Sequence, residues 1–408
     1  MASTTSPTRD RAVLATASVA ALSAVLVGCS GTPQGARALP SSSSAVQAGS
    51  SRDGSALVVR RLDLLKPNVD SGTPGPAARA AFRARFEHLR HNAKAVTLWI
   101  ANTAFGTLLG VDRSRTKVVD EIDVASEGCL DPVGVRVDHS QNIWVACQSE
   151  PSKTIADGSS EQEYSSSGKL LERYEWSAPC PSSASSCGAL GANDGGPDNG
   201  GHVFASLAAA AILVSGAQQN LDSGFFWWPA NKPKSTPTFI SLGAYCQPIC
   251  QPLFMDTDAS GNIWFTYRGV TGSQQGFGLG EVTDPTTDPQ IVTIFAPGKY
   301  ELGFGVFTSD AQTKLNVVDA GKRDIYQYEL PVTSASAPLK TLGPTASGFD
   351  SWGQPITGGF NKAETRLALG DQFGWLNVGA TASNIWTGAL NVDFLPYVLG
   401  ASYTPSDR

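Results

Sequence analysis

A 12-residue segment occurs twice in this chain, 120 positions apart. Residues 135–146 read Val-Arg-Val-Asp-His-Ser-Gln-Asn-Ile-Trp-Val-Ala, and residues 255–266 read Met-Asp-Thr-Asp-Ala-Ser-Gly-Asn-Ile-Trp-Phe-Thr. The residues that recur in register are Asp138 and Asp258, Asn142 and Asn262, and Trp144 and Trp264. Each copy predicts a strand, a tight turn in which Asp and Asn bond to the local backbone, and a second strand with a buried Trp.

Weaker strand-turn-strand copies lie at 202–215, 305–319 and 359–371, and residues 98–102 look like the second strand of one more. The predicted second strands centre near Trp99, Trp144, Leu213, Trp264, Val317 and Leu369, at separations of 45 to 69 residues. One small sheet cannot bury both of its faces, whereas sheets arranged in a ring bury each face against the next. The spacing therefore predicts an all-β protein with a six-bladed β-propeller over residues 95–408, and seven blades stay open as the alternative.

Two parts of the ring need a special explanation. The first blade has no inner strand ahead of Leu98, so we expect a segment within 384–400, or Leu57–Arg61, to complete it. The Ser/Gly-rich stretch 151–200 is predicted to be an extended loop. Within it, residues 193–200 read Asn-Asp-Gly-Gly-Pro-Asp-Asn-Gly, and we interpret them as a solvated loop rather than a calcium loop, because the EF-hand spacing is missing.

The N-terminus carries a different signal. Arg9 and Arg11 precede an apolar run from Ala12 to Val27, which is typical of a secretory signal and shorter than the roughly 20 residues that span a bilayer. The run Leu26-Val27-Gly28-Cys29 resembles the lipobox of bacterial lipoproteins. That resemblance implies cleavage before Cys29, lipid on its thiol, including palmitate, and export. Ser30 in place of Asp permits the outer membrane, if the cell has one.

The remaining N-terminal residues divide into two segments. Residues 29–56 are rich in Ser, Gly, Ala and Pro, and predict a disordered tether after the signal peptide 1–28. Residues 57–94 are expected to contain a short amphipathic helix over 76–92. That helix either caps the folded domain, which we favour, or lies on anionic lipid.

Six cysteines remain after Cys29, and an even number in an exported chain indicates disulfides. Sequence alone permits 15 connectivities. We favour the local pairing Cys129–Cys147, Cys180–Cys187 and Cys246–Cys250 over metal ligation, because no Cys-x-x-Cys pair is present and His is scarce. The net charge of −6, without a basic cluster, provides no electrostatic case for nucleic acid.

The two strong repeats resemble those of NHL-type propellers and streptogramin lyase-like propellers. The resemblance implies ligand binding at the mouth, where each outer strand leads into the next inner strand, and it covers lyases, lactonases and pure binding modules. A lyase of this kind needs a catalytic His with a Glu partner. Only His202 could approach the mouth, and we expect it to begin a strand instead.

A lactonase-like site needs carboxylates and amides around a divalent cation. Candidates before inner strands are Asp131, Gln251, Glu301 and Asp350, and candidates after second strands are Asn102, Gln148, Arg268, Arg323 and Gln372. No motif makes them converge, so the catalytic and metal-binding residues stay unknown. The aromatic run Phe225–Trp228 could form a stacking platform, but packing between blades is the interpretation we favour.

From the sequence we expect a lipid-anchored, exported propeller that binds a small ligand or another envelope protein at its mouth without catalysis. We expect a monomer with no cofactor. The alternative is a metal-dependent lactonase- or lyase-like enzyme of the same architecture, which would hold a divalent cation.

Overall fold

The computed structural model describes most of the predicted propeller region. It covers residues 95–403 apart from 115–116, 149–159, 176–190, 209–210, 215–216, 221–222, 243–249, 272–273, 310, 344–354, 362, 372–374 and 392–397. The predicted signal peptide, tether and helix lie outside these residues, as do Cys29, Cys180, Cys187, Cys246, Asp350 and Gln372. In the described part of the chain, no helix is long and apolar enough to cross a membrane.

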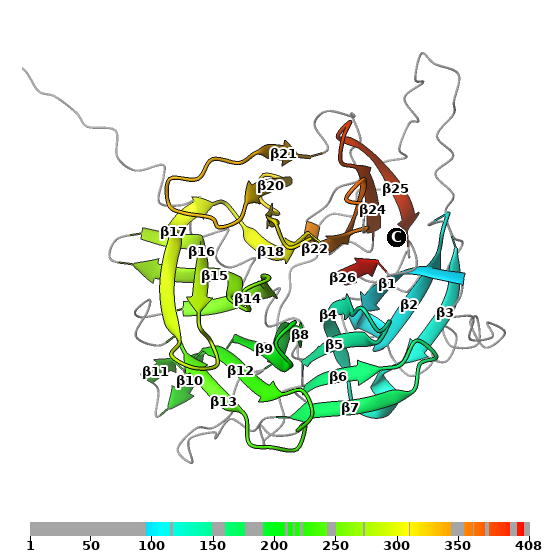
Figure 1. Cartoon of the computed structure of the whole chain (residues 1–408), viewed down its shortest axis with the longest axis horizontal. Coiled ribbons are helices and arrows are strands. Elements are labelled where there is room, and N and C mark those ends of the chain that lie inside the picture. The colour runs from blue at the N-terminus through cyan, green and yellow to red at the C-terminus, as the bar shows by residue number, and fades with distance from the viewer. Residues whose placement is uncertain are drawn as a thin grey trace, which may run out of the picture.

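Six four-stranded antiparallel blades stand in a ring around a central axis, which confirms the six-bladed β-propeller (Figure 1). Blade 1 contains β26 (Val398–Tyr403), β1 (Val96–Asn102), β2 (Thr107–Asp112) and β3 (Val118–Asp123). Blade 2 contains β4 (Asp131–Val137), β5 (Ile143–Gln148), β6 (Ser160–Tyr164) and β7 (Leu170–Glu175). Blade 3 contains β8 (Gly191–Pro197), β9 (His202–Ala208), β12 (Gly224–Pro229) and β13 (Thr238–Ser241).

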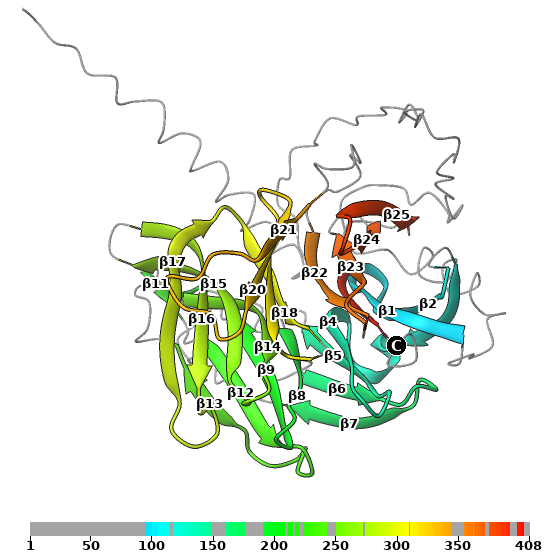
Figure 2. The same ribbon diagram turned by 45° about the horizontal axis from the view of Figure 1, so that its top comes forward.

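The second half of the ring repeats this order without interruption. Blade 4 contains β14 (Cys250–Thr257), β15 (Ile263–Thr271), β16 (Gln274–Thr283) and β17 (Gln290–Tyr300). Blade 5 contains β18 (Gly303–Thr308), β19 (Lys314–Asp319), β20 (Asp324–Glu329) and β21 (Lys340–Leu342). Blade 6 contains β22 (Pro355–Phe360), β23 (Arg366–Asp371), β24 (Trp375–Ala380) and β25 (Ile385–Asn391). Seen at 45°, the sheets stand side by side around the ring (Figure 2).

The ring is closed by the C-terminal strand. β26 pairs antiparallel with β1 and supplies the inner strand that the first blade lacks. The prediction that the far end of the chain completes this blade is therefore confirmed, although the strand lies at 398–403 and not mainly within 384–400. Closure of this kind pairs a sheet edge that would otherwise be open.

Blade 3 corrects three expectations. Its second strand is β9, not a strand centred on Leu213, because β10 (Ala211–Val214) pairs only with β11 (Ala217–Asn220) in a separate hairpin. Its inner strand is β8, so residues 193–197 of the expected solvated loop belong to a sheet. The stretch 151–200 also contributes β6 and β7 to blade 2 and is not one extended loop. The sequence of β8 is rich in Gly and polar residues, so it shows only a weak strand pattern. Side chains of neighbouring strands, and not those of β8 itself, fill the space around it.

Apolar side chains fill the seams between blades. Trp264 is fully buried in a cluster with Phe304 and Val317 of blade 5. The Phe225–Trp228 run packs in the same way, since Phe225 and Trp228 are fully buried and the Phe225 ring meets Phe265 of blade 4 at 5.0 Å. Packing between blades, the favoured interpretation of this run, is confirmed.

One predicted disulfide falls within the described residues, and it is present between Cys129 and Cys147. Cys129 precedes β4, and Cys147 lies near the end of β5, so the bond joins two chain segments at the same end of blade 2. Cys250 begins β14, but its side chain lies outside the described set.

Candidate functional site

The two ends of the ring are defined by strand direction. We call the end where inner strands begin and second strands finish the mouth end, and the end where an inner strand turns into the second strand the turn end. Asp131 and Gln251 lie at the mouth end, as the first and second residues of β4 and β14. Gln251 is paired in register with Arg268, and Asp131 with Gln148. These four candidates therefore lie at the mouth end, two on blade 2 and two on blade 4.

The mouth end of blade 5 carries Glu301 and Arg323. Both side chains are exposed, Glu301 just before β18 and Arg323 in the β19–β20 turn. Between them lies Asp319, which is fully buried. Its carboxylate accepts backbone N–H bonds from residues 301, 302, 321 and 322 at 2.9–3.3 Å. Asp319 therefore holds the loop that presents Glu301, and both carboxylate oxygens of Asp319 already accept hydrogen bonds from the backbone.

Arg268 is the half-buried cation of this end. Burial lowers the pKa of its guanidinium, and no carboxylate counteracts that effect. Within the described residues it forms no ion pair and no side-chain hydrogen bond. Uncompensated charge in a partly buried position is a mark of functional sites, because folding alone gains nothing from it.

A network that sequence reasoning missed joins four inner strands. The Arg136 guanidinium on β4 bonds to the Asp194 carboxylate of β8 at 2.9 Å, and it also pairs with the Asp256 carboxylate of β14. The second oxygen of Asp256 accepts the backbone N–H and the hydroxyl of Thr308 on β18, at 2.7 and 3.0 Å. Four consecutive inner strands are thus tied together beside the axis (Figure 1).

Glu161 on β6 faces the same network. Its side chain is fully buried, and neither carboxylate oxygen has a hydrogen-bond partner among the described residues. Burial, and then the Asp194 carboxylate, raises the pKa of Glu161 well above its ordinary value, while Arg136 lowers it. Burial also raises the pKa of Asp194 to about 6 against the attraction of Arg136. A Cβ at residue 195 would collide with Glu161, which is why β8 carries glycine there.

A spacing in the sequence could have located this network. Asp198 and His202 stand 60 residues from both strong repeats and occupy the places of Asp138 and Asn142. The His202 backbone N–H donates to Asp198 Oδ1 at 2.7 Å, the bond that Asn142 makes to Asp138 at 2.9 Å. The two strong repeats already make Arg136 and Asp256 equivalent positions, and the third copy places Asp194 on the inner strand of the blade between them. His202 begins β9 at the turn end, as expected of a strand-start residue.

At the turn end, the strong repeat forms a polar unit in blades 2 and 4. In blade 4 the indole N–H of Trp264 donates to Asp258 at 2.9 Å, and the Asn262 amide donates to Glu281 on β16 at 3.1 Å. Burial, with a further contribution from Asp258, raises the pKa of Glu281 to about 7, although the Asn262 bond lowers it. The turn and the buried Trp were predicted, whereas the Glu on the third strand was missed.

No group of three or more His, Cys, Asp or Glu side chains is placed to hold a metal ion within the described residues. Near the axis, the carboxylates of Asp194 and Asp256 instead face the guanidinium of Arg136. The cation beside these two acids is thus a protein side chain.

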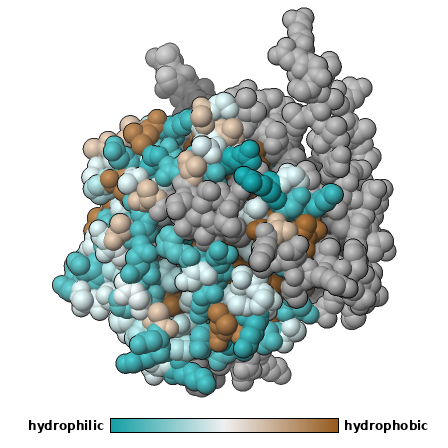
Figure 3. All heavy atoms as spheres, turned by 45° about the vertical axis from the view of Figure 1, so that its right-hand side comes forward, coloured by the Kyte–Doolittle hydropathy of each residue, from teal (hydrophilic) through white to brown (hydrophobic). Residues whose placement is uncertain are grey.

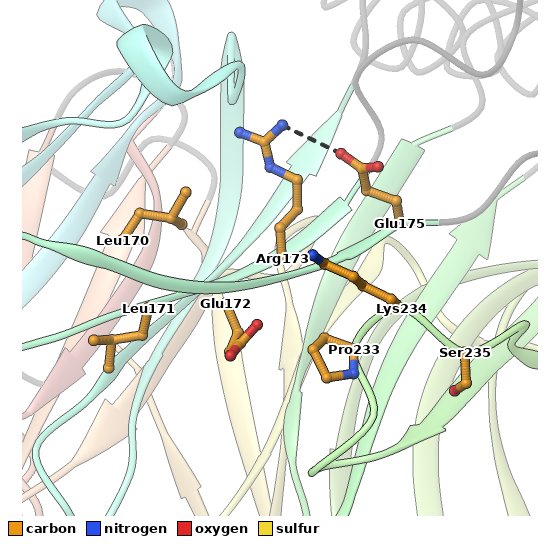
Figure 4. A pocket seen from close by; sticks show the side chains of 8 residues that line it. All are labelled: Leu170, Leu171, Glu172, Arg173, Glu175, Pro233, Lys234 and Ser235. Atoms are coloured by element: carbon orange, nitrogen blue, oxygen red, sulfur yellow. Dashed lines mark hydrogen bonds and ion pairs between the residues drawn. The ribbon is translucent and has the colours of Figure 1, made fainter.

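A shallow groove lies on the outer side of the ring, between β7 and the β12–β13 loop (Figure 4). It has a volume of about 500 Å³ and is lined by residues 170–173, Glu175 and Pro233–Ser235. Arg173 and Glu175, both on β7, form an ion pair at 3.2 Å along one wall of the groove. None of the sequence-predicted mouth residues lies there, and on the face shown in Figure 3 the described apolar residues occur in small scattered groups.

The comparisons with known proteins assign no family to this chain. No family model and no curated protein matches the chain. Among solved structures, a chain of a nidogen/laminin complex is similar, with 13% identity, a TM-score of 0.48, and coverage of 76% of this chain and 98% of that one. A hypothetical selenium-binding protein from Sulfolobus tokodaii has 9% identity, a TM-score of 0.48, and coverage of 70% and 74%.

A third similar structure is regucalcin, a calcium-binding protein from Agrobacterium tumefaciens, at 12% identity, a TM-score of 0.44, and coverage of 68% and 79%. The names of these structures differ in what they describe, and propeller folds host many functions. We transfer none of their ligands or activities to this chain.

Proposed function

We propose that this protein is a lipid-anchored, exported propeller that acts as a non-catalytic binding module in the bacterial cell envelope. Its partner is a small ligand or another envelope protein, held at the mouth end. The tether over 29–56 would keep the propeller clear of the membrane surface.

The observation that carries this proposal is the occupation of the acids nearest the axis. Catalysis by a metal or by general acid–base chemistry needs carboxylates that are free to bind a cation or to exchange a proton with substrate. Asp194 and Asp256 are held by Arg136, Thr308 and backbone amides instead. Their geometry serves to connect blades, which leaves the mouth end for recognition.

Export is supported by two independent features. The run ending at Cys29 resembles a lipobox, and Cys129 is bonded to Cys147. Structural disulfides persist in oxidising compartments and are rare in the cytosol. The disulfide thus fits the destination that the N-terminus implies.

The test combines metal analysis with a thermal melt. We expect the full chain, purified in detergent from the membrane fraction, to contain no stoichiometric divalent ion and to keep its Tm after chelator treatment. A stoichiometric ion whose removal lowers the Tm would overturn the binding-module proposal in favour of the metal-dependent enzyme, and a lactone-hydrolysis screen would follow.

The variant Cys29→Ala should move the protein out of the membrane fraction, and its retention there would contradict the lipid anchor.

A further inference from the structure

We propose that the mouth end of blades 4 and 5 is an anion site, in which Arg268 binds a carboxylate or phosphate group of the ligand. This inference rests on the proposed function, because it names the chemistry that the binding module recognises.

Strand alternation sets the direction of the Arg268 side chain. Side chains two residues apart on a strand lie on the same face. Thr266, two residues before Arg268, donates its hydroxyl hydrogen to the Phe304 carbonyl of blade 5. Trp264, two residues earlier, packs into the cluster that contains Phe304. Arg268 therefore continues this face at the mouth end and lies in the seam between blades 4 and 5.

The residues beside Arg268 in the sheet are neutral. On the inner strand its register partner is Gln251, and on the third strand it is Phe277. Phe277 is buried and Gln251 is half-buried. Neither neighbour supplies a negative charge, so a counterion must come from outside this sheet.

Other arginines of the described chain do not share this situation. Arg136 has Asp194 and Asp256, and Arg173 has Glu175. Arg323 and Arg366 are exposed, so water solvates their charge. Arg268 combines partial burial with the lack of an ion pair among the described residues, and an unpaired cation taken out of water costs free energy until an anion reaches it.

The charges at the mouth end of blades 4 and 5 favour an anion. Three further cations lie there on β17 and in the β19–β20 turn, namely Lys299, Lys322 and Arg323. Of the acids, the carboxylate of Asp319 is taken by backbone amides, which leaves Glu301 exposed and Asp324 half-buried. The planar guanidinium presents parallel N–H donors that match the two oxygens of a carboxylate or a phosphate.

Binding is tested on the full chain in detergent, by titration calorimetry with inorganic phosphate and, separately, with benzoate, at constant ionic strength. We expect both probes to bind the wild type and Arg268→Gln to weaken binding about tenfold or more, since hydrogen bonds to charged groups are the strong ones. Arg268→Lys keeps the positive charge but lacks the parallel N–H donors of the guanidinium, so its affinity should lie between those of the wild type and Arg268→Gln. The matched control is Arg366→Gln, which removes an exposed arginine at the turn end and should change affinity less than twofold.

The Tm of each variant separates binding from folding. We expect Arg268→Gln to keep or raise the Tm, because it removes an uncompensated charge. Three results would each overturn the anion site. The wild type binds neither probe, or Arg268→Gln binds with wild-type affinity, or Arg268→Gln loses binding and also has a lowered Tm. Titrations repeated with chelator distinguish the two proposals. If the probes bind only when a metal is present, the anion site is overturned. If the protein holds a metal tightly but probe binding depends on Arg268 and is unaffected by chelator, only the non-catalytic function is overturned.

Discussion

Blades 2 and 4 have the same sequence signature, and at the turn end they have the same structure. The indole N–H donates to the turn Asp at 3.0 Å in blade 2 and at 2.9 Å in blade 4. The Asn backbone N–H reaches the other oxygen of that Asp at 2.9 and 3.0 Å. All these groups belong to one hairpin, so nothing outside the blade needs to change for the unit to recur.

The same two blades differ at positions on the inner strand and at the mouth end. Arg136 and Asp256 occupy equivalent positions, two residues before the turn Asp, yet they carry opposite charges and pair with each other. At the mouth end, Gln148 of blade 2 corresponds to Arg268 of blade 4. The hydrogen bonds of the hairpin keep the repeat, whereas Arg136 and Asp256 carry the opposite charges that let them pair across two blades.

The largest effect is expected where the two blades meet. Arg136→Met should lower the free energy of unfolding by about 3–5 kcal/mol, because it leaves two carboxylates beside the axis without their cation. Urea denaturation at pH 7 measures this, with Arg366→Gln as a control within about 0.5 kcal/mol of wild type. A loss below about 1 kcal/mol would mean that the pairing of equivalent positions does not stabilise the ring.

The disulfide is the next difference between the blades. Cys147 has Tyr267 as its equivalent in blade 4. Replacing both Cys129 and Cys147 by Ala should cost about 3 kcal/mol, since the bond closes a loop with a sequence separation of 18. The urea midpoint under non-reducing conditions reports the loss. An unchanged midpoint would show that blade 2 needs no covalent support and is no weaker than blade 4.

The shared turn unit predicts similar costs in both blades. Trp144→Phe and Trp264→Phe should each lower stability by about 1–3 kcal/mol, because the turn Asp loses a donor. Urea denaturation of the two variants measures whether the costs agree within about 1 kcal/mol. A cost confined to one blade would break the equivalence that the hydrogen bonds indicate.

The smallest expected effect is a pH dependence. In the folded protein, burial raises the pKa of Glu281 from 4.5 to about 7, so the fold holds this proton more tightly than the unfolded chain. Its contribution to stability is present below pH 4.5 and is lost as the pH rises through about 7. Glu281→Gln should make the fall in unfolding free energy over that range less steep.

The equivalent variant in blade 2 sharpens this comparison. Burial also raises the pKa of Glu163, but its bond from Asn142 is shorter, 2.7 Å against 3.1 Å in blade 4, and this bond favours the charged form. We expect Glu163→Gln to flatten the pH profile less than Glu281→Gln does. Equal slopes in the two variants would contradict this ranking.

The failures of prediction lie where local pattern and tertiary contact disagree. Residues 193–197 look like a loop because Asp, Gly and Pro disfavour strands, yet they form β8. Neighbouring blades fill the space above its glycines with Glu161 and Arg136. The mouth candidates could be assigned to the correct end, because strand direction decides that, but a sequence does not reveal which of them lacks a partner.

Sequence alone predicted the all-β architecture and favoured six blades, closure from the far end and the Cys129–Cys147 bond, and the structure decided against the alternatives to these three. These features depend on hydrophobic alternation, turn chemistry and the order of strands, all of which act over short stretches of chain or follow from ring closure. Tertiary structure alone decided the Arg136 network, the burial of Glu161, the partial burial of Arg268 and the exposure of Arg323. Charges 58 to 120 residues apart become neighbours only when the ring forms, so their partners and burial are properties of the assembled blades.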